Sequence, residues 1–361
     1  MKKNKTKKRK NQRRGPPPAP AQRPPRVPDK GIIVRPVDTA LGAPLAEERA
    51  RLTQAAVDFS RSALAPATRK AYAEDAGRFQ VWCERHRLVA LPAGPQTVCL
   101  YLTALATNDN DAGRPRTVST IRRRMAAISK WHELSGLADP FDHPSIAPVW
   151  AGIRRTLGVA PTDIAEALVL DDVNRIARVL KDNLRDVRDR AALLLGFHGA
   201  NRRSEVTEME LSWLTLGERG MIVTFPFSKT NQEGELEQIA IPKADDPAVC
   251  PVEATREWLR VAGMGPGPIL RQITNHGNLS LKPLSGFGYS RIIKRLVTLI
   301  GLDPAGYSGH SVRRGYVTTA HRAGETDARI MERTRHKTTA MVHRYTAPDD
   351  LLVKIGKRET W

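Results

Sequence analysis

The sequence predicts a mainly α-helical protein in two parts, an all-α first half and an α+β second half with a small sheet. Apolar residues recur every three or four positions through most of residues 45–157 and again after residue 168. Residues 221–227 and 236–242 have the apolar, β-branched character of strands. With 361 residues and 40% hydrophobic content, the chain is long and apolar enough for about two domains.

Five helices are expected in the first half. Thr68 is a suitable N-cap for the second, and Pro95 fits the first turn of the third, where a missing N–H costs little. Thr117 or Ser119 starts the fourth helix, and Gly136 lies where that helix would end. The expected ranges are about 46–63, 68–86, 95–105, 117–131 and 144–157.

The second half is expected to be helical around one β-hairpin. The hairpin joins residues 221–227 to 236–242 through a polar tip at 228–234. The expected helices cover about 170–182, 186–198, 251–262, 286–300, 311–323, 326–334 and 338–345. The resulting domains are 45–157 and 169–348, with a linker at 158–168 and a short C-terminal segment at 349–361.

The net charge of +20 is unevenly placed. Residues 1–30 hold twelve Lys or Arg, one acid and seven prolines, which leaves +9 for residues 31–361. Such a composition cannot bury a core, so residues 1–44 are expected to be a disordered basic tail. Its role is either non-specific contact with DNA phosphates or a solubilising or targeting function. The basic body indicates a nucleic-acid partner, with an unspecialised basic protein as the alternative.

Composition excludes several classes of protein. No apolar run approaches the roughly 18 residues that a membrane span needs, and no apolar segment follows the basic N-terminus as in a secretory signal. Cys83, Cys99 and Cys250 are too few and too far apart for a disulfide framework or a cysteine-pair metal site. A reducing, cytoplasmic setting fits best.

Two helices of the first half are expected to carry a basic face opposite their apolar one, as a helix in a DNA groove does. The predicted DNA-binding residues are Arg69, Lys70 and Arg78 in the second helix and Arg122, Arg123, Arg124 and Lys130 in the fourth. The alternative is an ordinary solvated charged face. Groove contacts also depend on docking and DNA shape, so these side chains do not reveal a target sequence.

Four short motifs of the second half bear side chains suited to chemistry. They are Gly199-Ala200-Asn201-Arg202-Arg203-Ser204-Glu205, Lys229 at the hairpin tip, His310-Ser311-Val312-Arg313, and His336 with Tyr345 nine residues later. Taken singly, each has an ordinary explanation: a helical salt bridge, a solvated lysine, or a structural histidine or tyrosine. Together, in this order and spacing, they resemble the tyrosine recombinase (phage integrase) family, and the likeness runs from about residue 45 to 350.

Within that family the sequence is most similar to simple Cre-like recombinases. The closer likeness lies in residues 68–72, 119–124 and 308–311, and in the lack of a folded arm-binding domain before residue 45. The resemblance implies a helical, SAM-like core-binding domain and a catalytic domain that form a C-shaped clamp on double-stranded DNA. It implies no cofactor and no metal.

The resemblance also implies an assembly. The free protein would be a monomer or weak dimer, and a homotetramer would join two inverted-repeat sites and exchange strands through a Holliday junction. Residues 349–356 would dock as a short helix into a neighbouring protomer; packing on their own domain is the alternative. Such an enzyme integrates, excises or resolves a mobile element. Which element, which accessory proteins and which direction stay open.

The resemblance assigns the cleavage chemistry to four residues. Tyr345 would be the nucleophile, giving a 3′-phosphotyrosine and a free 5′-hydroxyl. Arg202 and Arg313 would clamp the two non-bridging phosphate oxygens, a task that suits the guanidinium fork. Lys229 would be the general acid that protonates the leaving 5′ oxygen.

Three further residues would support that chemistry. His310 would accept the tyrosine proton or hold the phosphate. His336 would donate a hydrogen bond to the phosphate. Glu205 would orient His310 or Arg202 from below.

Rival residues lie near several of these positions. The family spacing to Glu205 selects Arg202 over Arg203. The His-x-x-Arg spacing likewise selects Arg313 over Arg314. A zinc site made from the four histidines of residues 310–343 lacks a fitting cysteine or carboxylate spacing. Four nearby residues match no motif position: Tyr307 and Tyr316 are expected to pack or to contact the DNA backbone, and His321 and His343 are expected to be surface or structural residues.

The sequence departs from the family pattern at two places. Gly199 lies three residues before Arg202, where the family often has Gly two residues before, and Asn201 is adjacent. Arg335 precedes His336, where Gly is common. Both departures are expected to affect backbone turns rather than catalytic groups.

Two other functions share these features. A DNA-binding regulator of the same fold would keep the basic helices but would not need Tyr345 nine residues after His336. A type IB topoisomerase would share the tyrosine chemistry but relax DNA without choosing a site. The complete set of motifs favours a site-specific recombinase.

Overall fold

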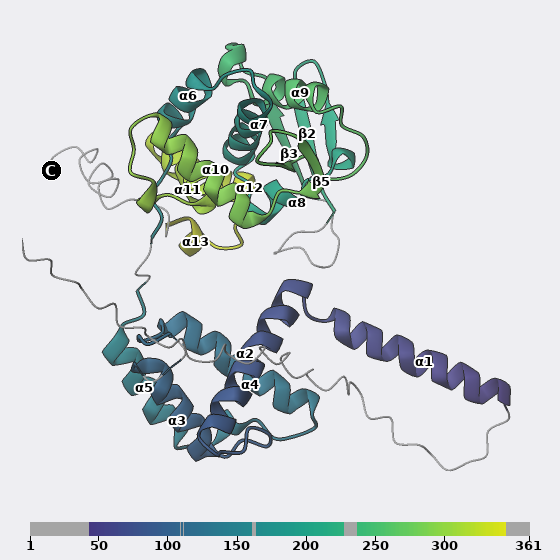
Figure 1. Cartoon of the computed structure of the whole chain (residues 1–361), viewed down its shortest axis with the longest axis vertical. Helices are drawn as coiled ribbons and strands as arrows, with labels where there is room; N and C mark the ends of the chain where they lie inside the picture. Colours follow the sequence, from purple (N-terminus) through teal and green to yellow (C-terminus); the bar gives the residue numbers. More distant parts are fainter. Residues whose placement is uncertain (1–42, 109, 111, 161–163, 227–236, 344–361) are drawn as a thin grey trace, which may run out of the picture. The chain divides into compact units, whose positions relative to one another are not determined.

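The computed structural model describes residues 43–108, 110, 112–160, 164–226 and 237–343 (Figure 1). The chain divides into two units, residues 1–160 and 161–361. Over the described residues the first unit is all-α, and the second combines helices with two small antiparallel sheets. The predicted fold class is therefore confirmed. None of the helices in these ranges is long and apolar enough to cross a membrane.

The helices of the first unit begin and end close to the expected positions. Their bounds are α1 (Ala43–Ser62), α2 (Pro66–Arg85), α3 (Pro95–Ala106), α4 (Val118–Leu134) and α5 (Ile146–Leu157). The prediction that Thr68 caps α2 is wrong, because Pro66 already occupies its first turn. For α4, the Thr117 side chain accepts a hydrogen bond from the Thr120 N–H, so Thr117 rather than Ser119 is the cap. Gly136, at a φ of 70°, follows the end of α4.

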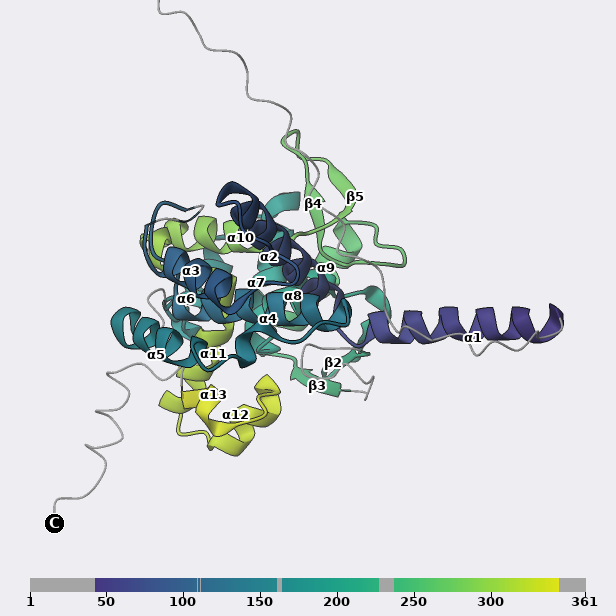
Figure 2. The ribbon, with the colours of Figure 1, turned by 90° about the horizontal axis from the view of Figure 1, so that it is seen from below.

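Apolar stripes on α2, α3 and α4 meet in the core of the first unit. Phe79, Leu102 and Ile128 are fully buried there. The rings of Phe79 and Tyr101 lie 4.9 Å apart, joining α2 to α3. In Figures 1 and 2, α1 extends away from the other helices of this unit.

The second unit contains eight helices and five strands over its described residues. The helices are α6 (Leu170–Val179), α7 (Leu184–His198), α8 (Arg203–Glu208), α9 (Pro251–Val261), α10 (Gly286–Leu299), α11 (Gly309–Arg322), α12 (Asp327–Thr334) and α13 (Thr339–His343). The strands are β1 (Leu214–Leu216), β2 (Gly220–Phe225), β3 (Glu237–Pro242), β4 (Arg271–Ile273) and β5 (Leu279–Pro283). All expected helices are present, and α8, β1, β4 and β5 are additional elements that are too short to show a clear apolar period.

The expected hairpin is confirmed as β2 and β3, which pair antiparallel from Gly220 opposite Pro242 to Phe225 opposite Glu237. β1 adds to the free edge of β2, giving the order β1-β2-β3. A separate two-stranded sheet pairs β4 with β5. In Figure 2 this second hairpin stands on the far side of the unit from α12 and α13.

Helix α7 is the central helix of the second unit. Residues 191–195 are fully buried, because α9 and α11 pack against α7. Along these five residues the helix is apolar on every side, unlike the amphipathic helices at the surface. Its C-terminus therefore holds the residues that follow it, which include Arg202, at a fixed place in the fold.

The predicted linker at 158–168 is shorter than expected. The Glu166 N–H donates to the Gly306 carbonyl at 2.8 Å, and the Leu168 N–H donates to the Ser311 carbonyl at 3.0 Å. Leu168 is also fully buried in the core of the second unit. Residues 166–168 are thus part of this unit and are bonded to the turn and helix that carry His310 and Arg313.

Replacing Gly315 in α11 with Ala should destabilise the second unit strongly. A Cβ atom at this position would lie 1.7 Å from the Leu168 carbonyl oxygen, far inside contact distance. Overpacking of this kind costs about 1–3 kcal/mol or more, and here backbone rather than a flexible side chain must move. Thermal unfolding should show a fall in Tm for Gly315→Ala. Gly265→Ala is the control, because nothing lies within 4 Å of its Cβ position; equal Tm values would contradict the close contact.

Candidate active site

The turn between α7 and α8 places Arg202 and Glu205. Ala200 has a φ of 46°, so the chain reverses sharply here. The Asn201 side-chain amide donates to the Leu195 carbonyl at 3.0 Å, and so provides a hydrogen bond to one of the carbonyls in the last turn of α7. Arg202 is the N-cap of α8, and Glu205 is in its first turn.

Glu205 holds Arg202 with both carboxylate oxygens. Its Oε2 accepts from the Arg202 backbone N–H and its Oε1 from Arg202 Nη1, each at 2.6 Å. Glu205 is only 5% exposed. Its contact with Arg202 therefore forms out of water, where a charge-assisted hydrogen bond is strong. The guanidinium of Arg202 also donates from Nη2 to the Arg335 carbonyl at 3.1 Å.

Helix α11 begins beside this turn and carries Arg313. Ser308 caps the helix and exchanges hydrogen bonds with Ser311. Arg313 is 2% exposed, and it donates to the Ala200 carbonyl at 2.5 Å and to the Thr334 carbonyl. One guanidinium thus joins the α7–α8 turn to the end of α12. His310, in the first turn of α11, is exposed.

The segment after α12 places His336, which is 6% exposed. Its Nδ1 lies 2.9 Å from Thr334 Oγ1. The Thr334 hydroxyl donates to the Ile330 carbonyl at 2.6 Å, since a carbonyl can only accept. Thr334 Oγ1 must then accept from His336 Nδ1–H. In the neutral ring the proton is on Nδ1, and Nε2 carries the lone pair.

Burial and positive charge govern titration in the site. Burial, with Arg313, Arg202 and Arg335 nearby, lowers the pKa of His336 to about 4, so the ring is neutral at pH 7. Burial alone would raise the pKa of Glu205. The charges of Arg335 and Arg202 and the hydrogen bonds from Arg202 outweigh it, and the pKa of Glu205 is lowered.

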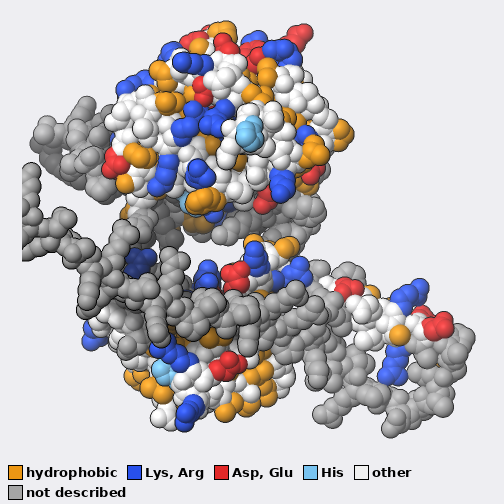
Figure 3. Space-filling view, viewed as in Figure 1, with side chains coloured by type: hydrophobic (Ala, Val, Ile, Leu, Met, Phe, Trp, Pro, Cys, Tyr) orange, Lys and Arg blue, Asp and Glu red, His pale blue; other side chains and the backbone are white. Residues whose placement is uncertain are grey.

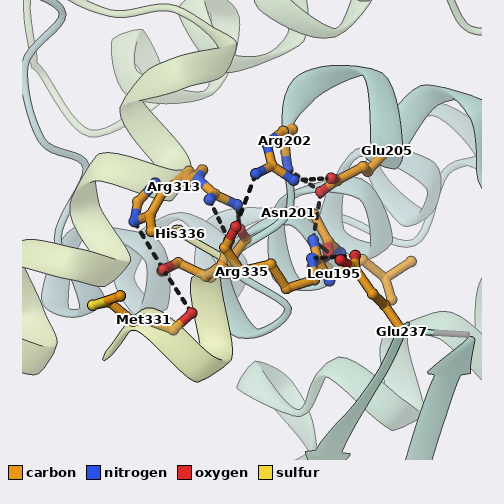
Figure 4. Close-up of polar contacts among 11 residues, drawn as sticks. Leu195, Asn201, Arg202, Glu205, Glu237, Arg313, Met331, Arg335 and His336 are labelled. Carbon is orange, nitrogen blue, oxygen red and sulfur yellow. Dashed lines mark hydrogen bonds and ion pairs between the residues drawn. The ribbon is translucent and has the colours of Figure 1, made fainter. Parts of the chain in front are cut away.

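The structure brings together four of the seven predicted catalytic residues: Arg202, Glu205, Arg313 and His336 (Figure 4). They come from three separate segments of the chain. Lys229 and Tyr345 lie outside the described residues, as do the tail at 1–42 and residues 349–356. Helix α13 ends at His343, two residues before Tyr345.

The rival residues occupy other environments. Arg203 is exposed, and its side chain lies 3.0 Å from where the Cβ atoms of Gly286 and Gly309 would be. Tyr307 is 6% exposed, and burial beside Glu166 raises its pKa to about 12. The Tyr316 ring packs edge-on against Phe197, with centroids 5.9 Å apart. Within the described ranges, no three His, Cys, Asp or Glu side chains are grouped to hold a metal ion.

The expectation that the two departures from the family pattern affect only backbone turns is wrong. The Arg335 guanidinium donates from Nη2 to Glu205 Oε2 at 2.5 Å and to Asn201 Oδ1 at 3.3 Å. Arg335 is therefore bonded to the carboxylate that holds Arg202, and Asn201 is bonded to Arg335. The motif spacing assigns no role to Arg335. The sequence feature that could have identified it as a site residue is a charged side chain at a position where the family commonly has Gly.

The predicted basic face of the first unit is only partly present. Asp75, 1% exposed, is surrounded by three of the arginines, with its oxygens 2.9 Å from Arg123 Nε, 3.6 Å from Arg78 Nη1 and 3.7 Å from Arg124 Nε. The prediction that Arg124 lies on this face is wrong. Its side chain is buried and donates to the Tyr101 hydroxyl at 3.0 Å.

The other predicted cations of this unit are at least partly accessible. Arg69, Lys70 and Arg122 are exposed, and Lys130 pairs with Glu133 at 2.6 Å. The Arg122 guanidinium lies 6.0 Å from the centre of the Trp150 ring. Figure 3 shows Lys and Arg side chains on the visible faces of both units, interspersed with acidic and apolar ones.

Known proteins are similar to this chain in sequence. The model of the phage integrase family matches residues 166–351. The chain is 35% identical over 303 residues to an integrase/recombinase xerD homolog of Selenomonas ruminantium, covering 83% of this chain and 86% of that protein.

Two solved structures have a similar fold. XerH site-specific recombinase, bound to palindromic difH substrate, matches with a TM-score of 0.54 and 12% identity over 80% of this chain and 78% of its own. A lambda integrase dimer bound to a COC′ core site matches with a TM-score of 0.52 and 16% identity, over 89% and 84%. The chain belongs to the phage integrase family, the tyrosine-type site-specific DNA recombinases.

Proposed function

We propose that this recombinase cuts and rejoins DNA strands through a 3′-phosphotyrosine formed by Tyr345, at a site where Arg202 and Arg313 hold the scissile phosphate. The observation that carries the proposal is the meeting of Arg202, Arg313 and His336, from three segments, in one cluster that also contains the buried carboxylate of Glu205. Two guanidiniums, those of Arg202 and Arg335, pair with that carboxylate, and the charge of Arg313 acts on the neighbouring His336. The local charge therefore favours an anion such as a DNA phosphate.

The chemistry follows from what each group can do. The Tyr345 oxygen attacks phosphorus, a P–O bond to tyrosine forms, and the bond to the 5′ oxygen breaks. Lys229 gives its proton to that leaving oxygen, and His310 takes the tyrosine proton. Arg202 and Arg313 stabilise the charge that develops on the non-bridging oxygens. The bond energy is kept in the phosphotyrosine, so another strand's 5′-hydroxyl can attack it without ATP.

His336 needs a change of charge before it can donate to the phosphate. In the neutral ring the only N–H is used on Thr334, and the low pKa keeps the ring neutral in the DNA-free protein. A bound phosphate anion raises the pKa of a neighbouring imidazole, because it favours the charged form. We infer that DNA binding protonates His336, which then donates from Nε2 to the phosphate.

The proposed partner is double-stranded DNA, which both the core-binding and the catalytic domain would contact. Support comes from the basic charge, from the accessible cations of α2 and α4, and from the DNA-bound state of the XerH and lambda integrase structures. Four protomers on two inverted-repeat sites, linked through residues 349–356, would exchange strands in two steps through a Holliday junction. The substrate would be the ends of a mobile element.

A covalent-adduct assay tests this function. DNA flanking the coding region, searched for a short inverted repeat with an asymmetric spacer, supplies the substrate, nicked so that cleavage cannot be reversed. The protein should form an adduct that survives denaturing detergent. Binding without an adduct would instead indicate a regulator of the same fold. Relaxation of a supercoiled plasmid without any such repeat would indicate a topoisomerase.

Deleting residues 1–30 should weaken DNA binding and flatten its dependence on salt. The segment carries twelve of the cations, and each phosphate contact adds about one unit to the slope of log affinity against log salt concentration. Cleavage at saturating protein should stay unchanged, since none of the proposed catalytic residues lies there. Affinity measured between 50 and 300 mM salt checks the first point. Loss of the adduct at saturation would show that the tail contributes to catalysis.

A further inference from the structure

Arg335 has an unusual backbone for a long side chain. It follows the last residue of α12 with a φ of 55°, in the left-handed region that glycine adopts most easily. Its side chain is nevertheless only 7% exposed. The contacts of the guanidinium must therefore compensate for both the backbone conformation and the burial of a charge.

One set of contacts joins Arg335 to the phosphate-clamping arginine. Arg335 Nη2 donates to Glu205 Oε2 at 2.5 Å, on the oxygen that also accepts the Arg202 N–H (Figure 4). The Arg335 carbonyl accepts from Arg202 Nη2 at 3.1 Å. Arg202 is thus held by Arg335 in two ways, directly through the backbone and indirectly through Glu205.

A second set of contacts joins Arg335 to the sheet. Its guanidinium lies 4.1 Å from the centre of the Phe225 ring, and its Nε lies 3.7 Å from Glu237 Oε2. Phe225 and Glu237 are cross-strand partners at the last paired position of β2 and β3. A single side chain therefore contacts the start of α8 and the adjoining ends of both strands.

We propose that Arg335 is a positioning residue for DNA cleavage: it keeps Glu205 aligned on Arg202, and it ties that pair to the ends of β2 and β3. This inference rests on the proposed function, because it assumes that Arg202 holds the scissile phosphate. An arginine is suited to the task, since its planar fork can pair with a carboxylate and stack on a ring at once. The three anchored segments give Arg202 little freedom to turn away from the phosphate.

The charges around Glu205 give a pH signature. The groups that face Glu205 or Arg335 are Arg202, Glu208, Glu237 and His336. Arg335 is the foremost of the charges that lower the pKa of Glu205, and burial opposes it. Without Arg335 the pKa of Glu205 should rise, so the carboxylate is lost at a higher pH as the solution is acidified.

The test compares Arg335→Gly, Arg335→Lys and the control Arg329→Ala on the nicked substrate, with single-turnover cleavage followed from pH 4.5 to 8. Gly keeps the left-handed backbone without strain, so it removes only the side chain. It should slow cleavage by up to about 100-fold and move the acid limb of the pH profile upward. Lys should restore the acid limb and part of the rate, because an ammonium still pairs with Glu205 but cannot stack on Phe225. Arg329, 75% exposed on α12, should tolerate the change.

Thermal stability supplies a readout that needs no cleavage. Because the pKa of Glu205 is lowered in the folded protein, ionised Glu205 stabilises the wild type at every pH above the ordinary pKa of a glutamate. This stabilisation is lost as the pH falls through the folded-state pKa. The Tm difference between wild type and Arg335→Gly should therefore shrink on acidification. The inference would be overturned if Arg335→Gly cleaved at the wild-type rate with an unshifted acid limb. It would also be overturned if Arg335→Gly cleaved slowly but its acid limb stayed in place and its Tm difference from the wild type did not change with pH. Absence of an adduct in the wild type would instead contradict the proposed function.

Discussion

Tyr345→Phe should abolish the covalent protein–DNA adduct on a nicked substrate while DNA affinity stays within a few fold of the wild type. Phenylalanine has no oxygen to attack phosphorus, and no other step of the proposed reaction can replace that bond. The nick makes the fragment that carries the free 5′-hydroxyl short enough to diffuse away after cleavage. Without this fragment the reaction cannot be reversed, so the adduct accumulates in the wild type. Gel electrophoresis under denaturing conditions measures it, and filter binding measures affinity.

Tyr316→Phe is the matched control for this experiment. Tyr316 is the tyrosine of α11 whose ring packs against Phe197, and phenylalanine keeps that packing. This variant should form adduct at close to the wild-type level. An adduct in Tyr345→Phe would show that the nucleophile is another residue, and its loss only in Tyr316→Phe would point to α11.

Arg202→Lys should lower the cleavage rate by about 100- to 1,000-fold, the range seen when a single donor to a developing oxyanion is removed. Lysine keeps the positive charge, but a single ammonium cannot replace the two Nη groups with which Arg202 now contacts Glu205 and the Arg335 carbonyl. DNA affinity should change much less, because Arg202 would make only one of the proposed phosphate contacts. Single-turnover rates at saturating protein separate the two effects.

Arg203→Lys provides the comparison that matters most for this assignment. Arg203 is adjacent in sequence but exposed, whereas the Arg202 side chain is 13% exposed and paired with Glu205. Cleavage by Arg203→Lys should stay within a few fold of the wild type. If the two variants exchange these results, Arg203 is the residue that holds the phosphate.

The long helices and the hairpin were predictable because each shows its own period. Residues 186–198 and 251–262, for example, carry enough apolar side chains to indicate helices without tertiary information, and α7 and α9 occupy nearly those ranges. β4 and β5 were not predictable, since strands of three and five residues form only where the fold supplies the paired edge.

Arg124 shows how a local pattern can mislead. It lies in a run of three arginines, which indicates a basic surface, yet it also follows the buried Ile121 by three residues and so shares its inner face. Its burial is acceptable because Asp75 and the Tyr101 hydroxyl, from α2 and α3, meet the guanidinium there. Neither partner is evident from the run itself.

The sequence by itself determined the helical segments, the hairpin and the spacing of the motifs that bear Arg202, His310, Arg313 and His336, because these depend on local periodicity and on residue identity. Only the tertiary structure decided how Glu205 is shared between Arg202 and Arg335, which proton His336 carries, and which arginines are buried. Glu205 and Arg335 are 130 residues apart, and their contact depends on three segments being folded around it. Burial removes the water that would otherwise screen these charges, so their pKa values and partners follow from the fold and not from the motif.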